Sequence, residues 1–212
     1  PPAAKRPFNL GEMLLDIANL PRAIKASFDI SASGRQGLFF AAGHPKEWLA
    51  SFADNVRSFR SAEGAAEVEW RIQSLPHFET LRKLGVFYAE EGAPLSQREE
   101  AYMTRWADKL PGIKQSSRAY RNALNSLRLR IGSTIYDGWS EAQRARSGEL
   151  LAKFLNEGSG RGTLGTVGGV NFGELAPLLN AAFFSPRNFA AKIQVPYNIM
   201  LAPLGKGYGR DV

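Results

Sequence analysis

The glycine-rich run at residues 160 to 165 comes nearest to a known chemical motif. Gly160-Arg161-Gly162-Thr163-Leu164-Gly165 matches the pattern G-x-G-x-x-G, which joins a strand to a helix in dinucleotide-binding folds. Here a helical pattern precedes the glycines, more glycines follow, and the chain has no G-K-[ST] sequence. These surroundings favour a flexible connector over a nucleotide site. Arg161 is a weaker candidate for contacting an anion at the tip of that loop.

The titratable side chains form no recognisable catalytic or metal-binding set. The chain has no cysteine, which excludes disulfides, zinc–thiolate sites and thiol nucleophiles. Its two histidines, His44 and His77, lie beside prolines, without a Ser, Asp or Glu at triad or metal-ligand spacing. We therefore expect no catalytic residue, no cofactor and no metal ion. One alternative is an enzyme whose site is assembled from distant residues, which a buried carboxylate beside either histidine would support.

The longest expected helix, at about residues 116–136, carries a set of cations that could contact a partner. Arg118, Arg121, Asn125 and Arg128 step by three, four and three residues, which places them in one polar stripe. A cationic stripe of this kind is suited to phosphate backbones or to an acidic protein surface. The competing interpretation is that these arginines pair with acids from elsewhere in the chain, such as Glu63, Glu67 and Glu69. The candidate contact residues are Lys114, Arg118, Arg121, Arg128, Arg130, Arg161 and Arg187.

The periodicity of the apolar residues predicts the elements that must position these side chains. It is mainly helical and indicates an all-α fold, an irregular bundle of about eight to ten helices with a glycine-rich loop near the C-terminus. The strongest helices are expected at 45–60, 62–74, 96–110, 116–136 and 140–156. Shorter ones are expected at 10–17, 31–42, 76–84, 175–182 and 186–193. A strand competes with a helix only at Gly85-Val86-Phe87-Tyr88.

Large apolar residues are expected to face the core of this bundle. In the helix at 45–60, one face carries Trp48, Leu49, Phe52, Val56 and Phe59. The tryptophans lie in similar helical patterns, and we predict that they pack in the core rather than stack on bases. They are Trp48, Trp70, Trp106 and Trp139.

The domain organisation is read from changes in composition. Residues 10–157 are predicted to form one helical core, 158–173 the glycine-rich loop, and 174–204 short helices packed on the core. The segments 1–9 and 205–212 resemble linkers, which suggests that the chain is a piece of something longer. No apolar run approaches the roughly 20 residues of a membrane-spanning helix. We therefore expect no membrane-spanning segment.

The charge of the chain narrows the class of partner. The formal net charge is +7 and the sequence pI is about 9.8. A basic balance favours acidic partners, which include nucleic acid, anionic lipid and acidic protein surfaces. Charge alone does not choose among these three.

Several segments together resemble one family. They are Asn19-Leu20-Pro21-Arg22-Ala23, Ser27-Phe28-Asp29-Ile30-Ser31-Ala32, Arg35-Gln36-Gly37-Leu38-Phe39, Arg98-Glu99-Glu100-Ala101-Tyr102, Arg105-Trp106-Ala107, Ser117-Arg118-Ala119-Tyr120, Phe154-Leu155-Asn156, Gly160-Arg161-Gly162 and Leu179-Asn180-Ala181-Ala182-Phe183-Phe184-Ser185-Pro186-Arg187. In this combination the chain resembles one of the large polyvalent protein-associated domains of tailed phages and mobile elements. The resemblance spans roughly residues 10 to 195.

The resemblance implies a setting but no chemistry. Such domains occur inside very long phage proteins and are thought to be packaged in the virion and delivered with the DNA. It implies a non-enzymatic helical module inside the virion that contacts other virion or phage proteins, forms homo-oligomers, or lies against double-stranded DNA. The alternative function is a nucleic-acid-binding domain that protects phage DNA in the host cytoplasm. The resemblance assigns no catalytic residue.

Overall fold

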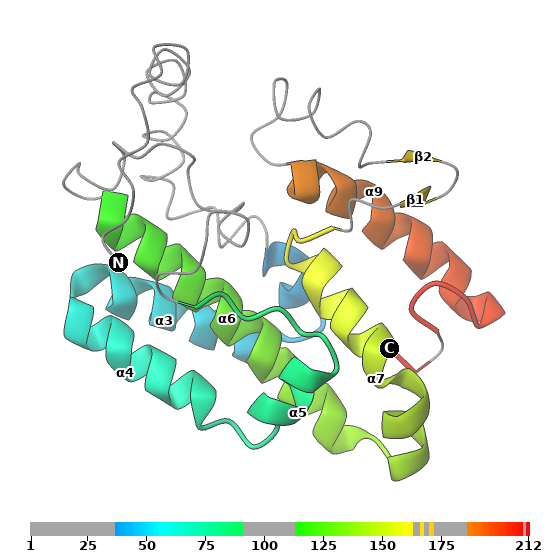
Figure 1. Cartoon of the computed structure of the whole chain (residues 1–212), viewed down its shortest axis with the longest axis horizontal. Helices are drawn as coiled ribbons and strands as arrows, with labels where there is room; N and C mark the ends of the chain where they lie inside the picture. Colours follow the sequence, from blue (N-terminus) through cyan, green and yellow to red (C-terminus); the bar gives the residue numbers. More distant parts are fainter. Residues whose placement is uncertain (1–36, 91–112, 163–165, 168–169, 172–185, 210) are drawn as a thin grey trace, which may run out of the picture.

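The all-α fold expected from the sequence is confirmed. A computed structural model describes residues 37–90, 113–162, 166–167, 170–171, 186–209 and 211–212. Within these ranges the elements are α-helices, one short 3-10 helix and one minimal strand pair (Figure 1). The expected helices at 10–17, 96–110 and 175–182 lie outside the described residues.

The helix α6, Ile113–Gly138, is the central element of the structure. It contacts α3, α4, α5 and α7, so that side chains on several of its faces are enclosed (Figure 1). Its apolar residues Leu124, Leu127 and Ile131 are at most 1% exposed and belong to the core. The helix begins a few residues before the expected serine cap and ends close to the predicted position.

The helices α3, Pro45–Arg60, and α4, Ala62–Gln73, form an antiparallel pair beside α6 (Figure 1). Their junction is short because Ser61 ends α3 in an extended conformation and its hydroxyl then caps α4 by accepting from Gly64 N. The short helix α5, Phe78–Lys83, follows and buries Phe78 and Leu81 in the core. A further helical turn at 37–41 precedes α3.

The stretch where a strand competed with a helix is neither. Residues 86–90 form no regular secondary structure, and asparagine side chains satisfy their backbone. Asn156 accepts from Phe87 N and donates to Gly85 O, while Asn125 accepts from Ala89 N and donates to Ala89 O. Two side-chain amides therefore replace the partner strand that this segment lacks.

The helix α7, Glu141–Gly158, begins at a capping box formed by Ser140 and Gln143. It runs two residues further than the sequence predicted, to Gly158. A Cβ at this position would lie 2.5 Å from Cζ of Phe40, so glycine allows that buried ring to pack against the helix end. The predicted loop therefore starts later than expected.

Beyond α7 the structure departs from the predicted loop in a second way. Thr166–Val167 (β1) pairs antiparallel with Val170–Asn171 (β2), with Thr166 opposite Asn171 and Val167 opposite Val170. These four residues form the only strand pair within the described part of the chain.

The helix α9, Pro186–Leu201, is longer than the predicted 186–193 and is followed by the 3-10 helix η2, Ala202–Leu204. The predicted end at Ile193 lies three residues before Pro196, which is inside α9. Pro196 removes one hydrogen bond to the carbonyl of Lys192, and both residues are exposed, where water can satisfy that carbonyl.

The residues after η2 do not behave as the linker that their composition suggested. Tyr208 is 2% exposed and donates to Glu157 Oε2 at 2.7 Å. Burial, followed by this hydrogen bond, raises the pKa of the Tyr208 hydroxyl. Asp211 accepts from Arg146 and Ser147. The segment 205–212 is thus docked on α7 (Figure 1), and the linker interpretation was wrong for its described residues.

Candidate contact surfaces

The polar side chains of α6 that face α3 and α4 repeat every four residues. They are Arg118, Asn122, Ser126 and Arg130. Arg118 donates to Ser58 O at 2.7 Å, and Asn122 donates both to Ser58 Oγ and to Ala65 O at 3.0 Å. This spacing follows a ridge of the helix, which brings all four side chains to the same interface.

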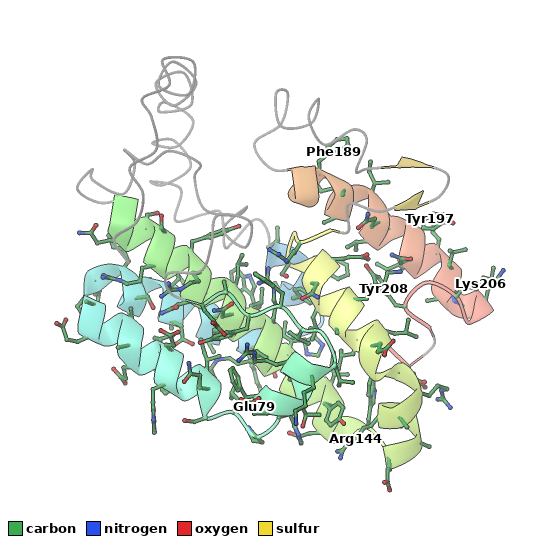
Figure 2. All side chains as sticks on the ribbon, viewed as in Figure 1. Glu79, Arg144, Phe189, Tyr197, Lys206 and Tyr208 are labelled. Atoms are coloured by element: carbon green, nitrogen blue, oxygen red, sulfur yellow. The ribbon has the colours of Figure 1, made fainter. Side chains whose placement is uncertain are left out.

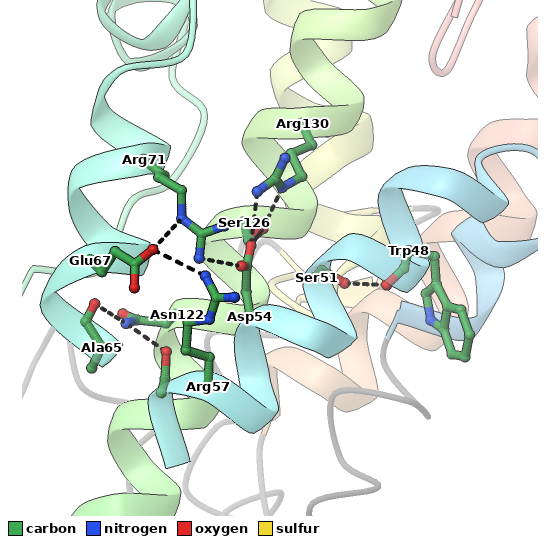
Figure 3. Close-up of polar contacts among 11 residues, drawn as sticks. Trp48, Ser51, Asp54, Arg57, Ala65, Glu67, Arg71, Asn122, Ser126 and Arg130 are labelled. Carbon is green, nitrogen blue, oxygen red and sulfur yellow. Dashed lines mark hydrogen bonds and ion pairs between the residues drawn. The ribbon is translucent and has the colours of Figure 1, made fainter. Parts of the chain in front are cut away.

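Asp54 of α3 is the centre of this interface (Figure 3). It is 3% exposed, and its carboxylate accepts from Ser126 Oγ at 2.7 Å and from Arg130 at 3.0 Å, with Arg71 of α4 at 3.3 Å. Glu67 then lies between Arg71 and Arg57 (Figure 3). The result is a chain of alternating charges that joins α3, α4 and α6. We call Asp54, Arg57, Glu67, Arg71, Ser126 and Arg130 the Asp54 cluster.

Apart from Arg118, the stripe proposed from the sequence lies on a different side of α6. Arg121 approaches Glu69 at 4.0 Å, Asn125 holds the backbone of Ala89, and Arg128 is 0% exposed and donates to Ser159 Oγ at 2.5 Å. Glu69 also accepts a hydrogen bond from the hydroxyl of Tyr88. Burial is the main cause that raises the pKa of Tyr88 to about 12. This stripe therefore faces the interior.

Of the two interpretations left open for the arginines of α6, the structure favours engagement within the molecule for those that it describes. Arg118, Arg121, Arg128 and Arg130 are buried or half-buried and engaged within the molecule. The interpretation that these arginines pair with acids from elsewhere in the chain agrees better with the structure. Glu69, which approaches Arg121, is one of the acids that it proposed. Whether any of the candidates contacts a partner stays a prediction. The side chains of Lys114 and Arg187 lie outside the described residues.

Arg161 does not project from a loop tip. Its guanidinium lies over the ring of Phe87, with Cζ 3.3 Å from the centroid, and Arg128 approaches the same ring at 5.4 Å. The helix before it, rather than a strand, agrees with the argument against a dinucleotide site.

A pocket of about 310 Å³ lies between α7 and residues 84–85, and Arg161 lines it together with acids and a lysine of α7. Its described lining contains no histidine, serine or threonine, so it holds no serine–histidine or threonine–histidine pair. The lining residues are Leu84, Gly85, Glu149, Ala152, Lys153, Asn156, Glu157, Arg161 and Gly162.

The histidines do not meet the condition set for an assembled active site. His77 Nε2 lies 2.6 Å from Asp137 Oδ1, but that carboxylate is 61% exposed. His44 lies 4.0 Å from Glu47, which is beyond hydrogen-bond distance. Among the described residues no group of three His, Asp or Glu side chains could hold a metal ion. The absence of an enzymatic activity stays a prediction.

The apolar side of α3 is only partly covered, which differs from the expected orientation: Trp48 packs against the core as predicted, whereas Leu49 and Phe52 face outward. The fully buried residues of the helix α3 are all polar: Ser51, Asp54, Asn55 and Ser58. Leu49 is 59% and Phe52 40% exposed. Trp48, half-buried, stacks on Phe52 with 6.2 Å between ring centroids. We call Leu49, Phe52 and Val56 the α3 face.

The tryptophans also differ in how far they are buried. Trp139 is 8% exposed and packs in the core as predicted, whereas Trp70 on α4 is 67% exposed and the core prediction was wrong for it. Trp106 lies outside the described residues. Sequence periodicity missed these exposed surfaces because it shows that a helix is two-sided but not which side its neighbours select.

The helix α9, like α3, buries polar side chains and leaves large apolar ones exposed. Its buried residues include Ala190, Ala191, Gln194 and Asn198, each at most 2% exposed. Asn198 donates to Glu157 and accepts from Lys153 of α7, which sets the rotation of α9 about its axis. The opposite side carries what we call the α9 stripe: Ile193, Tyr197, Met200 and, in η2, Leu204, at spacings of four, three and four residues.

No helix among the described residues is long and apolar enough to cross a membrane. Comparison with known proteins yields no matching family model, no matching curated protein and no matching solved structure.

Proposed function

We propose that this chain is a non-enzymatic helical interaction module that contacts a neighbouring protein through the α3 face. The observation that supports this most is the inversion of α3, which buries four polar side chains against α6 and leaves Leu49 and Phe52 outside. The Asp54 cluster prevents α3 from turning its apolar side inward, because rotation would carry Asp54 away from Ser126, Arg71 and Arg130 and leave the two half-buried guanidiniums without their carboxylate.

Burial of the apolar side chains on the α3 face would stabilise a complex with a partner. Covering a leucine or phenylalanine side chain that would otherwise face water contributes about 1.5–3 kcal/mol each when burial is complete. Leu49 and Phe52 together, with the half-buried Val56 between them and Trp48 stacked on Phe52, provide an apolar centre. Cations lie at both ends of this side of α3, since Lys46, Arg57 and Arg60 are exposed. The partner surface that fits is apolar with an acidic rim.

The biological setting that we propose is a large phage protein, with the module inside the virion beside other phage proteins. This part of the proposal rests on the resemblance of the sequence segments to polyvalent protein-associated domains. A DNA-protecting role in the host is the second candidate. It is less well supported, because the described arginines of α6 are engaged inside the molecule.

A photo-crosslinking amino acid at position 52 of the full-length chain, in the particles or cells that contain it, tests the α3 face. We expect an adduct with one protein, or with a second copy, and none from position 149, where Glu149 is also exposed. The crosslinked protein is then purified and its affinity measured. The pair Leu49→Ser and Phe52→Ser should weaken binding by about tenfold or more.

The matched control is the pair Met200→Ser and Leu204→Ser, which removes two exposed apolar side chains from the α9 stripe. Its affinity for the partner should equal that of the unaltered chain. Equal crosslinking from positions 52 and 149, or equal loss of affinity in both pairs, would contradict a specific α3 interface.

A further inference from the structure

We propose that the α9 stripe binds an anionic lipid surface, with α9 lying in the plane of the membrane interface. The proposal is independent of the α3 face. It starts from the concentration of exposed apolar side chains at the C-terminal end of the described chain. Half of the ten exposed large hydrophobic residues lie within twelve positions: Ile193, Tyr197, Ile199, Met200 and Leu204.

The orientation of this surface is set by the fold. Asn198 is buried between Lys153 and Glu157, and Tyr208 bonds to the same Glu157 carboxylate. Figure 2 shows Tyr208 between α7 and α9, and Tyr197 and Lys206 on the side of α9 away from α7. Among the described elements, the main contacts of α9 are with α7 and η2. Met200 at 77% and Leu204 at 69% exposure project furthest into solvent.

The charges beside the stripe select an anionic surface. From Leu175 to Arg210 the sequence has four cations, Arg187, Lys192, Lys206 and Arg210, and no acid. Lys192 and Lys206 are exposed and lie at opposite ends of the stripe. Lysine at the ends of an apolar stripe can keep its stem on the apolar layer and its ammonium among lipid phosphates. The net charge of +7 adds attraction at longer range.

The same side chains fit a protein partner less well. A specific protein interface makes about one hydrogen bond per 100–200 Å² of area. From Phe189 onward, where the side chains of α9 and η2 are described, the exposed ones provide hydrogen-bonding groups only at Lys192 and Tyr197, with Lys206 just beyond. A lipid surface requires no such pairing, and tyrosine and lysine are the polar groups that favour its interface.

Co-flotation of the purified chain with vesicles tests the proposal. One set consists of phosphatidylcholine alone and the other of an equimolar mixture with phosphatidylserine. We expect binding to the mixed vesicles and little to the neutral ones. The pair Met200→Ser and Leu204→Ser should lower the partition coefficient by about tenfold or more. Lys192→Glu and Lys206→Glu should each lower it by about fivefold, and added salt should weaken binding.

The control pair is Leu49→Ser and Phe52→Ser, which should bind vesicles as the unaltered chain does, while circular dichroism checks that all variants remain helical. Absence of binding to mixed vesicles, or equal binding by the Met200/Leu204 pair, would overturn the proposal. So would a dimer of the unaltered chain that this pair dissociates without any vesicle binding, because the stripe would then cover a second copy. Since the α3 experiment measures a protein partner, the two proposals can fail separately.

Discussion

At the scale of residues, the molecule encloses a few charged side chains and gives each of them polar partners. Asp54 has two arginines and a serine around one buried carboxylate. A buried charge is tolerated only when such partners replace the water that it loses. The arginines of α6 that invite a phosphate-binding interpretation therefore serve first to hold α3, α4 and α6 together.

We expect Asp54→Asn to lower the free energy of unfolding by about 2 kcal/mol, because it removes a charge from hydrogen bonds to Arg130 and leaves that guanidinium with a weaker partner. Urea unfolding followed by circular dichroism measures the change. Glu149→Gln removes an exposed acid from α7 and should change the unfolding free energy by less than about 0.5 kcal/mol. Equal values for the two variants would show that the Asp54 cluster does not stabilise the helix packing.

At the scale of elements, segment 205–212 is docked on α7 through Tyr208 and through the carboxylate of Asp211. The hydrogen bond from Arg146, followed by that from Ser147, lowers the pKa of Asp211 below its ordinary value of 3.8. A lowered pKa in the folded state means that docking is fully stabilised above the ordinary pKa and is lost as the pH falls through the lowered one. The charge on Asp211 therefore matters at neutral pH and disappears only in acid.

Amide NMR signals of Tyr208 and Val212 should consequently stay constant from neutral pH down to about pH 4 and shift towards random-coil positions below it. Asp211→Asn should produce the shifted positions already at neutral pH, since its amide cannot form the ion pair with Arg146. Asp137→Asn, at an exposed carboxylate beside His77, serves as the control and should leave both signals unchanged. If the signals changed neither with pH nor with Asp211→Asn, Tyr208 alone would hold the segment on α7.

At the scale of the whole molecule, the described arginines of α6 do not form an exposed cationic face for DNA, because they are engaged inside the molecule. Charge reversal at Arg118, Arg121 and Arg128 would unfold the interior rather than test a DNA contact, because these side chains bond to Ser58, Glu69 and Ser159. Salt dependence is the better test. We expect weak binding to duplex DNA with a slope of log affinity against log salt of magnitude about 3 or less, which corresponds to few phosphate contacts. A slope near −6 would restore the DNA-binding alternative.

The sequence by itself determined the helical class, most element boundaries and the lack of a recognisable catalytic motif. These features depend on local rules: a 3.6-residue periodicity, caps such as Ser61 and Ser140, and breaks at proline and glycine. The errors at Pro196 and Gly158 have local causes as well, because both residues usually end a helix and here the surroundings tolerate them.

Only the tertiary structure decided which side of each helix is inside. The pattern at 45–60 showed an apolar side and a polar side, and burial of the apolar side is the ordinary outcome. The opposite occurs because α6 presents Arg118, Asn122, Ser126 and Arg130 to α3, and polar groups enclosed there require polar partners. That pairing joins residues more than 50 positions apart, which no local pattern encodes. It leaves apolar surface outside on α3, as the contacts with α7 do on α9, and these two surfaces are where we expect the module to act.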